Sequence, residues 1–549
     1  MKKSILSFAA VLLVGCAADN GPLSIFQTEP LTQVLPCDSV FVDRPDTMSA
    51  ARGENVTFQF ILTSEQDVEG LSAEVTRTKG LGVKTGWVHD VHNENPTWGT
   101  DDMLEDPGND YPDPIFDDWD EAITVGKHKT VWVDVAIPRD AKPGLHTCRL
   151  TVKGTAEGKE VSATKDFKVK VYPVTLPEEQ GLDVVIWYQA AAVRYLGDKG
   201  EEVEVGSDRY YELLPKICEL AAAYGQNCWK PQEDPVAVLN ADSTDIAFDF
   251  TTYDRSVETF VKYGNMRHLH NNQFGSRNFA LGWDGGHVFD IAYVENKELK
   301  KETVNYNDPR LKEYIYKYFP ALQEHLREKG WLDMSLQHLI DEPSGPGTDS
   351  QKSYTMVAEM IHDAMPGMKI LDACFSPIEG QDIPVVLLGP NIATMPPVEE
   401  GQQRFMYTAS GPVGPFANRF IQLPLLKTRI LHWLNYRYNE SGYLHWGLNY
   451  WTYFRDPVGL TDVSTKCYWP GGDTHIIYPG HEKAYPSIRL CAMRDGIRDY
   501  DLLKMVEARD PQKAMEFARR VVFEPDVYEM DPAKFREIRR DILEYLSQK

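Results

Sequence analysis

The chain has 549 residues, of which 42% are hydrophobic and 11% aromatic, and its formal net charge is −25. This length exceeds one small core and predicts about two to four domains. The hydrophobic content excludes an intrinsically disordered protein. A strongly acidic chain disfavours nucleic acid, itself a polyanion, as a partner.

The N-terminus has the pattern of an export signal. Two lysines precede the apolar run 5–14, which is followed by glycine and Cys16, so residues 1–15 are interpreted as a signal peptide. The end of this run resembles a bacterial lipobox, which predicts acylation of Cys16; the alternative is a plain signal peptide with a chance cysteine. The run is too short to span a bilayer as a helix. We expect an exported protein, lipid-anchored to a bacterial membrane at its periplasmic face or the cell surface, with a linker at 16–30.

A β-domain is predicted at 31–176. The segments 56–62, 130–137 and 167–172 alternate apolar and polar residues, and prolines and glycines mark the turns between them. Short strands with such turns are typical of a β-sandwich. An acidic stretch at 101–121 is interpreted as a solvated loop, with a calcium site or a loop over the neighbouring domain as alternatives.

Residues 177–485 change to strands that alternate with helices, which indicates a parallel sheet. Over about 280 residues, a (β/α)8 barrel of the TIM type is the favoured form. Helices follow at 486–549, approximately as 486–508 and 510–547, and we expect them to pack on the barrel. The predicted fold is therefore multidomain, an N-terminal β-sandwich followed by an α/β barrel with C-terminal helices.

The most informative motif is the acid pair Asp341 and Glu342. The apolar run 334–340 ends in these two carboxylates and is closed by Pro343, which predicts a buried strand that enters a loop. Chemistry in a (β/α)8 barrel lies at the ends of its strands, and buried acids are costly without a role. The alternative is a helix cap or an ion pair at a strand end.

Adjacency limits the chemistry that the acid pair can perform. Retaining glycosidases with two carboxylates place them roughly 5–5.5 Å apart across the substrate, and adjacent acids seldom straddle a sugar in this way. They suit the substrate-assisted route, in which the 2-acetamido oxygen of the sugar attacks its own anomeric carbon. Asp341 would hold the acetamide N–H, and Glu342 would protonate the leaving group. Two like charges also raise one of the pKa values. No metal or cofactor is expected, because the substrate carries the nucleophile.

Further sugar contacts are expected near the ends of other predicted strands. Flat rings stack on the C–H faces of sugars, and residues 433–485 are rich in aromatic rings. The candidate substrate-binding residues are Trp187, Tyr407, His445, Trp446, Asn449, Trp451 and Asp473. The alternative for each ring is packing in the barrel core, and His268 and His270 are expected to be structural.

Other enzyme classes lose support from missing motifs. The chain has no GxGxxG before a helix, no GxxxxGK[ST], no HExxH and no GxSxG, which disfavours nucleotide-binding, zinc-protease and α/β-hydrolase functions. Its seven cysteines beyond Cys16 are scattered without the spacing of a zinc site.

Four stretches resemble glycoside hydrolase family 123, the β-N-acetylgalactosaminidases, and the wider group that shares their catalytic domain. They are 111–144, with YPDP, VWVDV and PRDAKPG; 338–343, HLIDEP; 443–457, with YLHWGLNYW and DP; and 486–502, PSIRLCAMRDGIRDYDL. The resemblance implies a β-sandwich followed by a (β/α)8 barrel. It also implies substrate-assisted retaining hydrolysis, with the Asp-Glu pair of the family at Asp341 and Glu342.

Three functional hypotheses follow. The leading one is an exo-acting β-N-acetylgalactosaminidase whose partner is a glycan or glycoconjugate. The second is a hydrolase of another 2-acetamido sugar, such as a β-N-acetylglucosaminide. The third is a lipid-anchored glycan-binding protein without catalytic activity.

Overall fold

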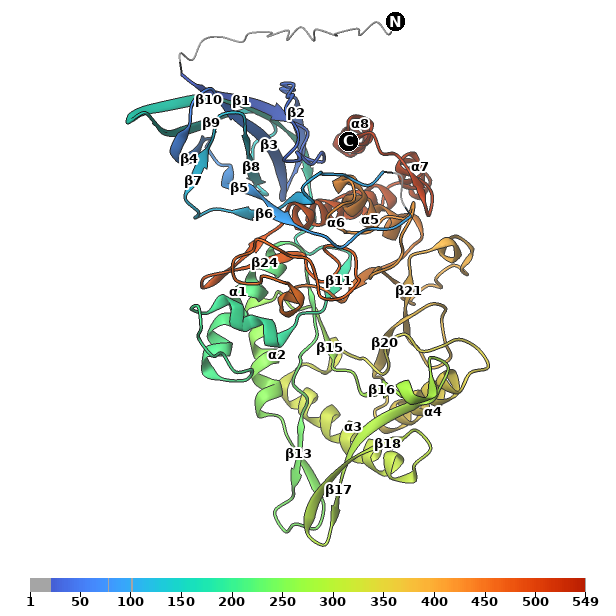
Figure 1. Cartoon of the computed structure of the whole chain (residues 1–549). Coiled ribbons are helices and arrows are strands. Elements are labelled where there is room, and N and C mark those ends of the chain that lie inside the picture. Colours follow the sequence, from blue (N-terminus) through green and yellow to red (C-terminus); the bar gives the residue numbers. More distant parts are fainter. Residues whose placement is uncertain (1–20, 78, 100–101, 549) are drawn as a thin grey trace, which may run out of the picture.

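The computed structural model describes residues 21–77, 79–99 and 102–548. The predicted signal peptide and Cys16 lie outside these residues. Among the residues described, no helix has the length and apolar character needed to cross a bilayer. Figure 1 shows a β-domain at the N-terminal end, a barrel domain below it, and the C-terminal helices beside both.

The N-terminal domain is a β-sandwich, as predicted. One sheet has the order β1-β3-β8-β5-β6 and the other β2-β10-β9-β4-β7. The strands are β1 (Leu23–Thr28), β2 (Thr47–Arg52), β3 (Glu54–Ser64), β4 (Val68–Thr76), β5 (Gly82–His92), β6 (Asp110–Phe116), β7 (Glu121–Ile123), β8 (His128–Ile137), β9 (Gly144–Ala156) and β10 (Lys159–Thr175). Side chains of β9 alternate between buried and exposed, as expected for a strand with one face on the core. Between the sheets, the rings of Phe58, Phe60 and Phe167 pack with centroids 4.6–6.3 Å apart.

Two expectations for this domain need correction. Residues 23–28, expected in a linker, form β1 and pair with β3. Part of the acidic stretch is not a solvated loop, because residues 110–116 form the largely buried strand β6. Its Asp113 accepts two hydrogen bonds from Arg489 in the C-terminal region, at 2.9 and 2.7 Å. This segment therefore joins the two domains, in line with the alternative of a loop over the neighbouring domain.

The second domain is a closed barrel of eight parallel strands. In order they are β11 (Asp183–Ile186), β12 (Cys228–Trp229), β15 (His268–Asn271), β19 (Ser335–Gln337), β20 (Lys369–Cys374), β21 (Ile383–Leu387), β22 (Phe405–Tyr407) and β23 (Gly442–His445). The barrel closes where β11 pairs with β23. Its crossover helices are α1 (Asp208–Ala223), α2 (Thr251–Tyr263), α3 (Pro309–Lys329), α4 (Asp349–Ala364) and α5 (Leu425–Arg437), and α6 (Ile488–Glu507) follows β23. The connections after β20 and β21 carry no α-helix, and the second of them contains a 3-10 helix at Pro390–Thr394.

Two excursions extend the loops of the barrel. The hairpin of β13 (Val236–Leu239) and β14 (Ile246–Asp249) follows β12. A three-stranded sheet of β16 (Gly275–Arg277), β17 (His287–Glu295) and β18 (Glu298–Asn305) follows β15. Figure 1 shows β17 and β18 reaching the end of the molecule farthest from the sandwich. A further hairpin, β24 (Ile477–Gly480) and β25 (Lys483–Pro486), precedes α6.

The C-terminal region is more divided than predicted. The expected helix 510–547 is two helices, α7 (Pro511–Val521) and α8 (Pro532–Ser547), separated by the hairpin of β26 (Val522–Glu524) and β27 (Val527–Tyr528). Each helix begins at Pro with an Asp side chain as its N-cap, a strong local start signal.

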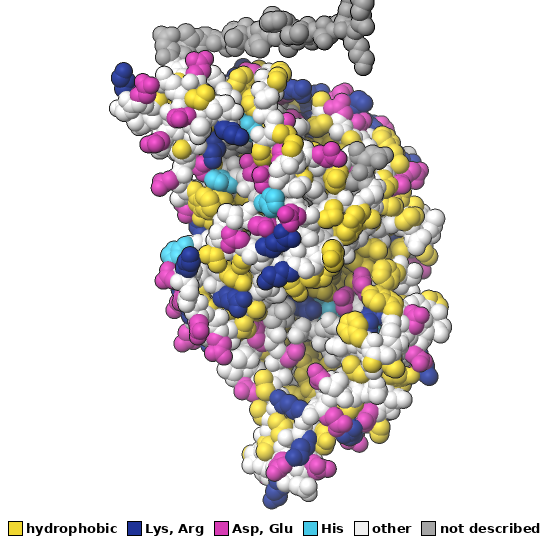
Figure 2. Space-filling view, viewed as in Figure 1, with side chains coloured by type: hydrophobic (Ala, Val, Ile, Leu, Met, Phe, Trp, Pro, Cys, Tyr) yellow, Lys and Arg dark blue, Asp and Glu magenta, His cyan; other side chains and the backbone are white. Residues whose placement is uncertain are grey.

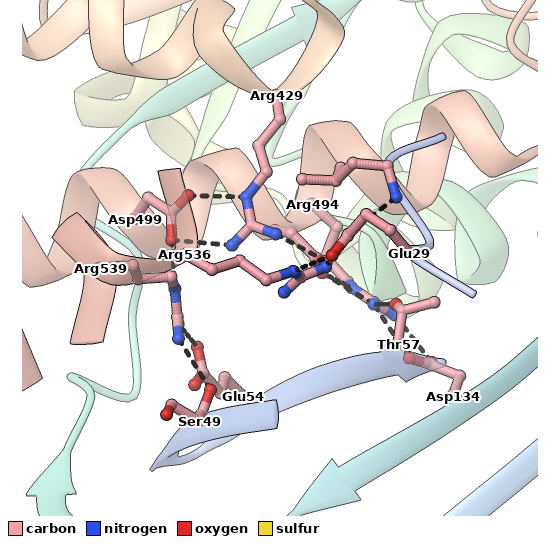
Figure 3. Close-up of polar contacts among 12 residues, drawn as sticks. Glu29, Ser49, Glu54, Thr57, Asp134, Arg429, Arg494, Asp499, Arg536 and Arg539 are labelled. Atoms are coloured by element: carbon pink, nitrogen blue, oxygen red, sulfur yellow. Dashed lines mark hydrogen bonds and ion pairs between the residues drawn. The ribbon is translucent and has the colours of Figure 1, made fainter. Parts of the chain in front are cut away.

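Buried ion pairs connect the C-terminal helices to the sandwich (Figure 3). Asp499 of α6 accepts hydrogen bonds at 2.7–3.0 Å from two guanidinium groups, those of Arg429 in α5 and Arg539 in α8. Arg539 also pairs with Glu54 of β3. Arg494 of α6 makes a bidentate pair with Asp134 of β8, at 2.7 and 2.9 Å. A buried charge that loses its partner is strongly destabilising, so these pairs couple the two domains.

Acidic and basic side chains are interspersed on the face shown in Figure 2. On that face the acidic side chains are therefore separated by lysines and arginines.

Candidate active site

The acid pair lies just beyond β19, at the C-terminal end of the barrel strands. The strand itself covers Ser335–Gln337, which is shorter than predicted, and the next residues continue into the loop that carries Asp341 and Glu342. Glu342 has a φ of +48°, a conformation uncommon for residues other than glycine and frequent at functional sites. Its N–H donates to the carbonyl of Ala373 on β20, at 3.1 Å. The neighbouring strand thus fixes the turn that presents the two carboxyls.

Arg277, the last residue of β16, holds the loop that carries Asp341 and Glu342, which we call the acid loop. Its Nη2 donates to the backbone carbonyls of Glu342 at 2.6 Å and Asp341 at 3.3 Å. Its guanidinium carbon lies 3.6 Å from the ring centroid of Trp283, a cation–π contact. The side chain therefore supports the loop backbone and brings a positive charge close to both acids.

The two carboxyls have different surroundings. Burial raises the pKa of Asp341 to about 6; the charge of Glu342 also raises it, and the charges of Lys230 and Arg277 act in the opposite direction. The carboxyl of Glu342 accepts a hydrogen bond from the hydroxyl of Tyr407, at 2.5 Å. Burial and the charge of Glu342 hold the pKa of Tyr407 far above its usual range, so the phenol remains a donor. Unequal environments for paired acids are typical of sites that use one as base and the other as acid.

A buried lysine lies beneath the acids. Lys230 follows β12, and its Nζ contacts Nδ1 of His338 at 2.8 Å and lies 4.1 Å from the ring centroid of Trp187. Burial lowers the pKa of Lys230 to about 8, although the carboxyls of Asp341 and Asp372 partly offset this. Lys230 thus places a positive charge among buried acids, with an aromatic face as one wall.

Asp372 of β20 completes this layer. It is fully buried and accepts hydrogen bonds from the hydroxyl of Tyr354 at 2.7 Å and from the backbone N–H groups of Leu339 and Ile340 at 2.9–3.3 Å. Burial raises its pKa to about 8 despite these donors. Asp372 therefore fixes the chain that leads from β19 to the acid pair.

One group of side chains has the composition of a metal site. His270, His338 and Asp372 offer three ligand atoms within 4.8 Å of one another. However, the Lys230 ammonium occupies the other ring nitrogen of His338, and a positive charge at that place opposes a second cation. These residues fit a buried hydrogen-bonded layer better than a cation site.

Trp446 follows β23 and belongs to a cluster of partly exposed rings. Its ring centroid lies 4.8 Å from Tyr450, 5.0 Å from Trp469 and 6.5 Å from Tyr453. Burial raises the pKa of Tyr450 well above its usual range, and the charges of Tyr453 and Asp341 add to this rise. The cluster therefore lies within electrostatic reach of the acid pair. Of the other predicted ring contacts, Tyr407 binds Glu342, and Trp187 is largely buried against Lys230 in the layer beneath the acids.

The structure places four other predicted sugar contacts in the protein interior. Trp451 is fully buried, and its Nε1 donates to the carbonyl of Ile477 at 2.8 Å. The buried amide of Asn449 binds the backbone of Gln189, at 2.7 and 3.4 Å. These two residues are packing and loop-fixing groups, and their assignment as sugar contacts needs correction.

His445 and Asp473 are also fully buried. Nδ1 of His445 accepts from Arg419 at 2.6 Å and from the N–H of Gly447 at 3.0 Å, so Nε2 carries the proton and faces Asp473 at 3.4 Å. Asp473 in turn accepts from Nε1 of Trp446 at 3.3 Å. Both residues thus support Trp446 from behind, in place of the predicted contact with a sugar.

Sequence reasoning missed Lys230, Arg277 and Asp372. A lysine directly after a strand as short as Cys228–Trp229 has no periodic pattern around it. Arg277 lies on an excursion, 65 residues before the carbonyl that it binds. The signal available for Asp372 was a carboxylate inside the apolar strand 369–374, where an unpaired charge is costly.

Comparisons with known proteins identify a family and structures that are similar to this chain. The family model described as glycoside hydrolase 123, catalytic domain, matches residues 200–506. A family 123 glycoside hydrolase from Clostridium perfringens, described in a study of glycolipid glycan hydrolysis, aligns over 96% of this chain and 97% of its own. Its TM-score is 0.72 and its identity 17%. A family 39 glycoside hydrolase from Bacteroides cellulosilyticus aligns over 82% of this chain and 81% of its own, with a TM-score of 0.32 and 10% identity. No curated protein sequence matches.

The family match covers more than half of the chain and includes the acid pair, the Tyr407 donor and the Trp446 cluster. The solved structure shares the succession of sandwich and barrel. The protein therefore belongs to glycoside hydrolase family 123, and its barrel is that of a glycan-hydrolysing enzyme.

Proposed function

We propose that the protein releases terminal β-linked N-acetylgalactosamine with retention of configuration, by substrate-assisted catalysis. The observation that carries the proposal is the pair of adjacent carboxyls beyond β19, with different surroundings. Asp341, with its pKa at about 6, is mainly ionised at neutral pH and can orient the acetamide N–H and stabilise the oxazolinium charge. Glu342 protonates the glycosidic oxygen and then takes a proton from water.

In the first step, the acetamide carbonyl oxygen bonds to the anomeric carbon, and the bond from that carbon to the leaving oxygen breaks. The proton of Glu342 passes to the leaving oxygen. In the second step, water gives a proton to Glu342 and its oxygen to the anomeric carbon, which reopens the ring of the intermediate. The two inversions give net retention.

The test is release of nitrophenol from the β-GalNAc and β-GlcNAc aryl glycosides. We expect GalNAc-selective turnover, lowered about 100- to 1,000-fold in Asp341→Asn, because a charge that stabilises the transition state is lost. An aryl leaving group needs little protonation, so Glu342→Gln keeps more activity than Asp341→Asn. Asp333→Asn, an exposed acid in the preceding turn, is the matched control and retains the wild-type rate.

Other outcomes identify the competing functions. Selective turnover of the β-GlcNAc glycoside would assign the alternative acetamido sugar. Binding of either sugar without turnover by folded wild-type protein would assign a glycan-binding protein. A thiazoline mimic of the oxazoline should inhibit competitively, and undiminished turnover at saturating mimic would count against participation of the acetamide.

A further inference from the structure

A second aromatic pair, separate from the Trp446 cluster, lies beside the acid loop. Trp283 and Phe375 have ring centroids 6.3 Å apart with planes inclined by 45°. They remain 50% and 43% exposed, so both rings are open to solvent. Trp283 comes from the connection between β16 and β17, and Phe375 directly follows β20. Two segments distant in sequence therefore present rings to solvent at one place.

Both segments that carry these rings are bonded to the loop that carries Glu342. The carbonyl of Trp283 accepts from Nη1 of Arg277 at 2.7 Å and from the hydroxyl of Ser344 at 2.9 Å. Arg277 at the same time binds the Glu342 carbonyl and lies against the Trp283 ring. On the other side, the N–H of Glu342 binds the carbonyl of Ala373, two residues before Phe375. The two segments that carry the rings are thus hydrogen-bonded to the loop of the residue that is proposed to protonate the leaving group.

We infer that Trp283 and Phe375 form the binding platform for the sugar that leaves. This inference rests on the proposed function, because it takes Glu342 as the acid. A general acid acts from roughly 2.6–3.2 Å, so the sugar attached through the protonated oxygen lies within one ring width of Glu342. Exposed aromatic faces in that position stack on the C–H face of a hexopyranose. The ligand is therefore a β-GalNAc unit linked to another hexose, and the platform selects glycosides with a sugar ring in the leaving group.

The experiment compares two substrates in each variant. One is GalNAc β-linked to galactose, and the other is methyl β-GalNAc, whose leaving group has no ring to stack. For Trp283→Ala and Phe375→Ala, the ratio of kcat/KM for the disaccharide to that for the methyl glycoside should fall about 10- to 100-fold. Trp283→Phe, which keeps a ring, should recover most of this ratio. Phe523→Ala removes a 46% exposed ring on β26 and is the matched control that keeps the wild-type ratio.

Each result has a defined meaning. An equal fall for both substrates in Trp283→Ala would show that the ring only supports the acid loop, and would overturn the inference. An unchanged ratio in the Trp283→Ala, Phe375→Ala double variant would overturn it as well. Wild-type protein that cleaves neither substrate and does not bind the thiazoline mimic would instead refute the proposed function itself.

Discussion

Replacement of Lys230 by Met tests whether the buried charge sets the ionisation of Asp341. Lys230 is ionised in the range where Asp341 titrates, because its own pKa is about 8. An opposite charge within about 4–6 Å lowers the pKa of a carboxyl by roughly 1–3 units. Without Lys230, the pKa of Asp341 should therefore rise from about 6 to roughly 7–9. Arg277 remains as the opposing positive charge.

The size of the effect follows from the ionised fraction. At pH 7, a carboxyl with a pKa of about 6 is roughly 90% ionised, and one with a pKa of about 7–9 is roughly 50% to 1% ionised. If ionised Asp341 is required, kcat/KM at pH 7 falls about 2- to 100-fold, and the acidic limb of its pH profile moves upward by about 1–3 units.

The assay is the pH dependence of kcat/KM on the aryl GalNAc glycoside, measured from about pH 4 to about pH 9. Activity of Lys230→Met should recover as the pH rises. Lys262→Met, an exposed lysine of α2, should reproduce the wild-type profile. Superimposable acidic limbs for Lys230→Met and wild type, with both proteins folded, would refute the electrostatic role of Lys230.

Three further outcomes are expected. Tyr407→Phe removes the donor to Glu342 and should lower kcat/KM for GalNAc β-linked to galactose about tenfold or more, since a hydrogen bond to a charged group contributes about 1.5–3 kcal/mol; a wild-type rate on this disaccharide would contradict this. Asp499→Asn weakens the pairing of two buried guanidinium groups and should cost about 3–5 kcal/mol in urea unfolding. The exposed Asp166→Asn should cost about 0–1 kcal/mol, and equal losses would argue against the buried network. Burial would raise the pKa of Asp499, but its arginine partners outweigh this and lower it from 3.8. Its stabilisation is therefore present above that pH and lost as the pH falls through the lower folded-state pKa, so urea midpoints should converge between wild type and Asp499→Asn in acid.

The acid pair could be predicted because its signal is local. An apolar run that ends in two carboxylates and a proline contains the strand, its end and the chemistry within ten consecutive residues, 334–343. The barrel could be predicted from the alternation of strands and helices over its whole length. Neither expectation required knowledge of which distant residues meet.

The missed features depend on contacts across the fold. Residues 110–116 contain two prolines and two aspartates, a composition typical of a loop, yet β6 is the edge strand of its sheet, where a missing N–H is tolerated. The predicted sugar contacts Trp451 and Asn449 are wrong because aromatic and amide side chains suit both a ligand and a core. The loop from β23 turns them inward, and periodicity alone does not reveal that direction.

The closure of the barrel determines which fragments of this enzyme can fold. The family match begins at residue 200, but the strand that joins the two ends of the barrel, β11, lies at Asp183–Ile186 and pairs with both β12 and β23. A gene fragment bounded by the match would encode an open sheet with two unpaired edges, which invites aggregation. It would also leave Arg494 without Asp134 of the sandwich. A fragment of this hydrolase that folds should therefore include β11 together with the sandwich that supplies Asp134.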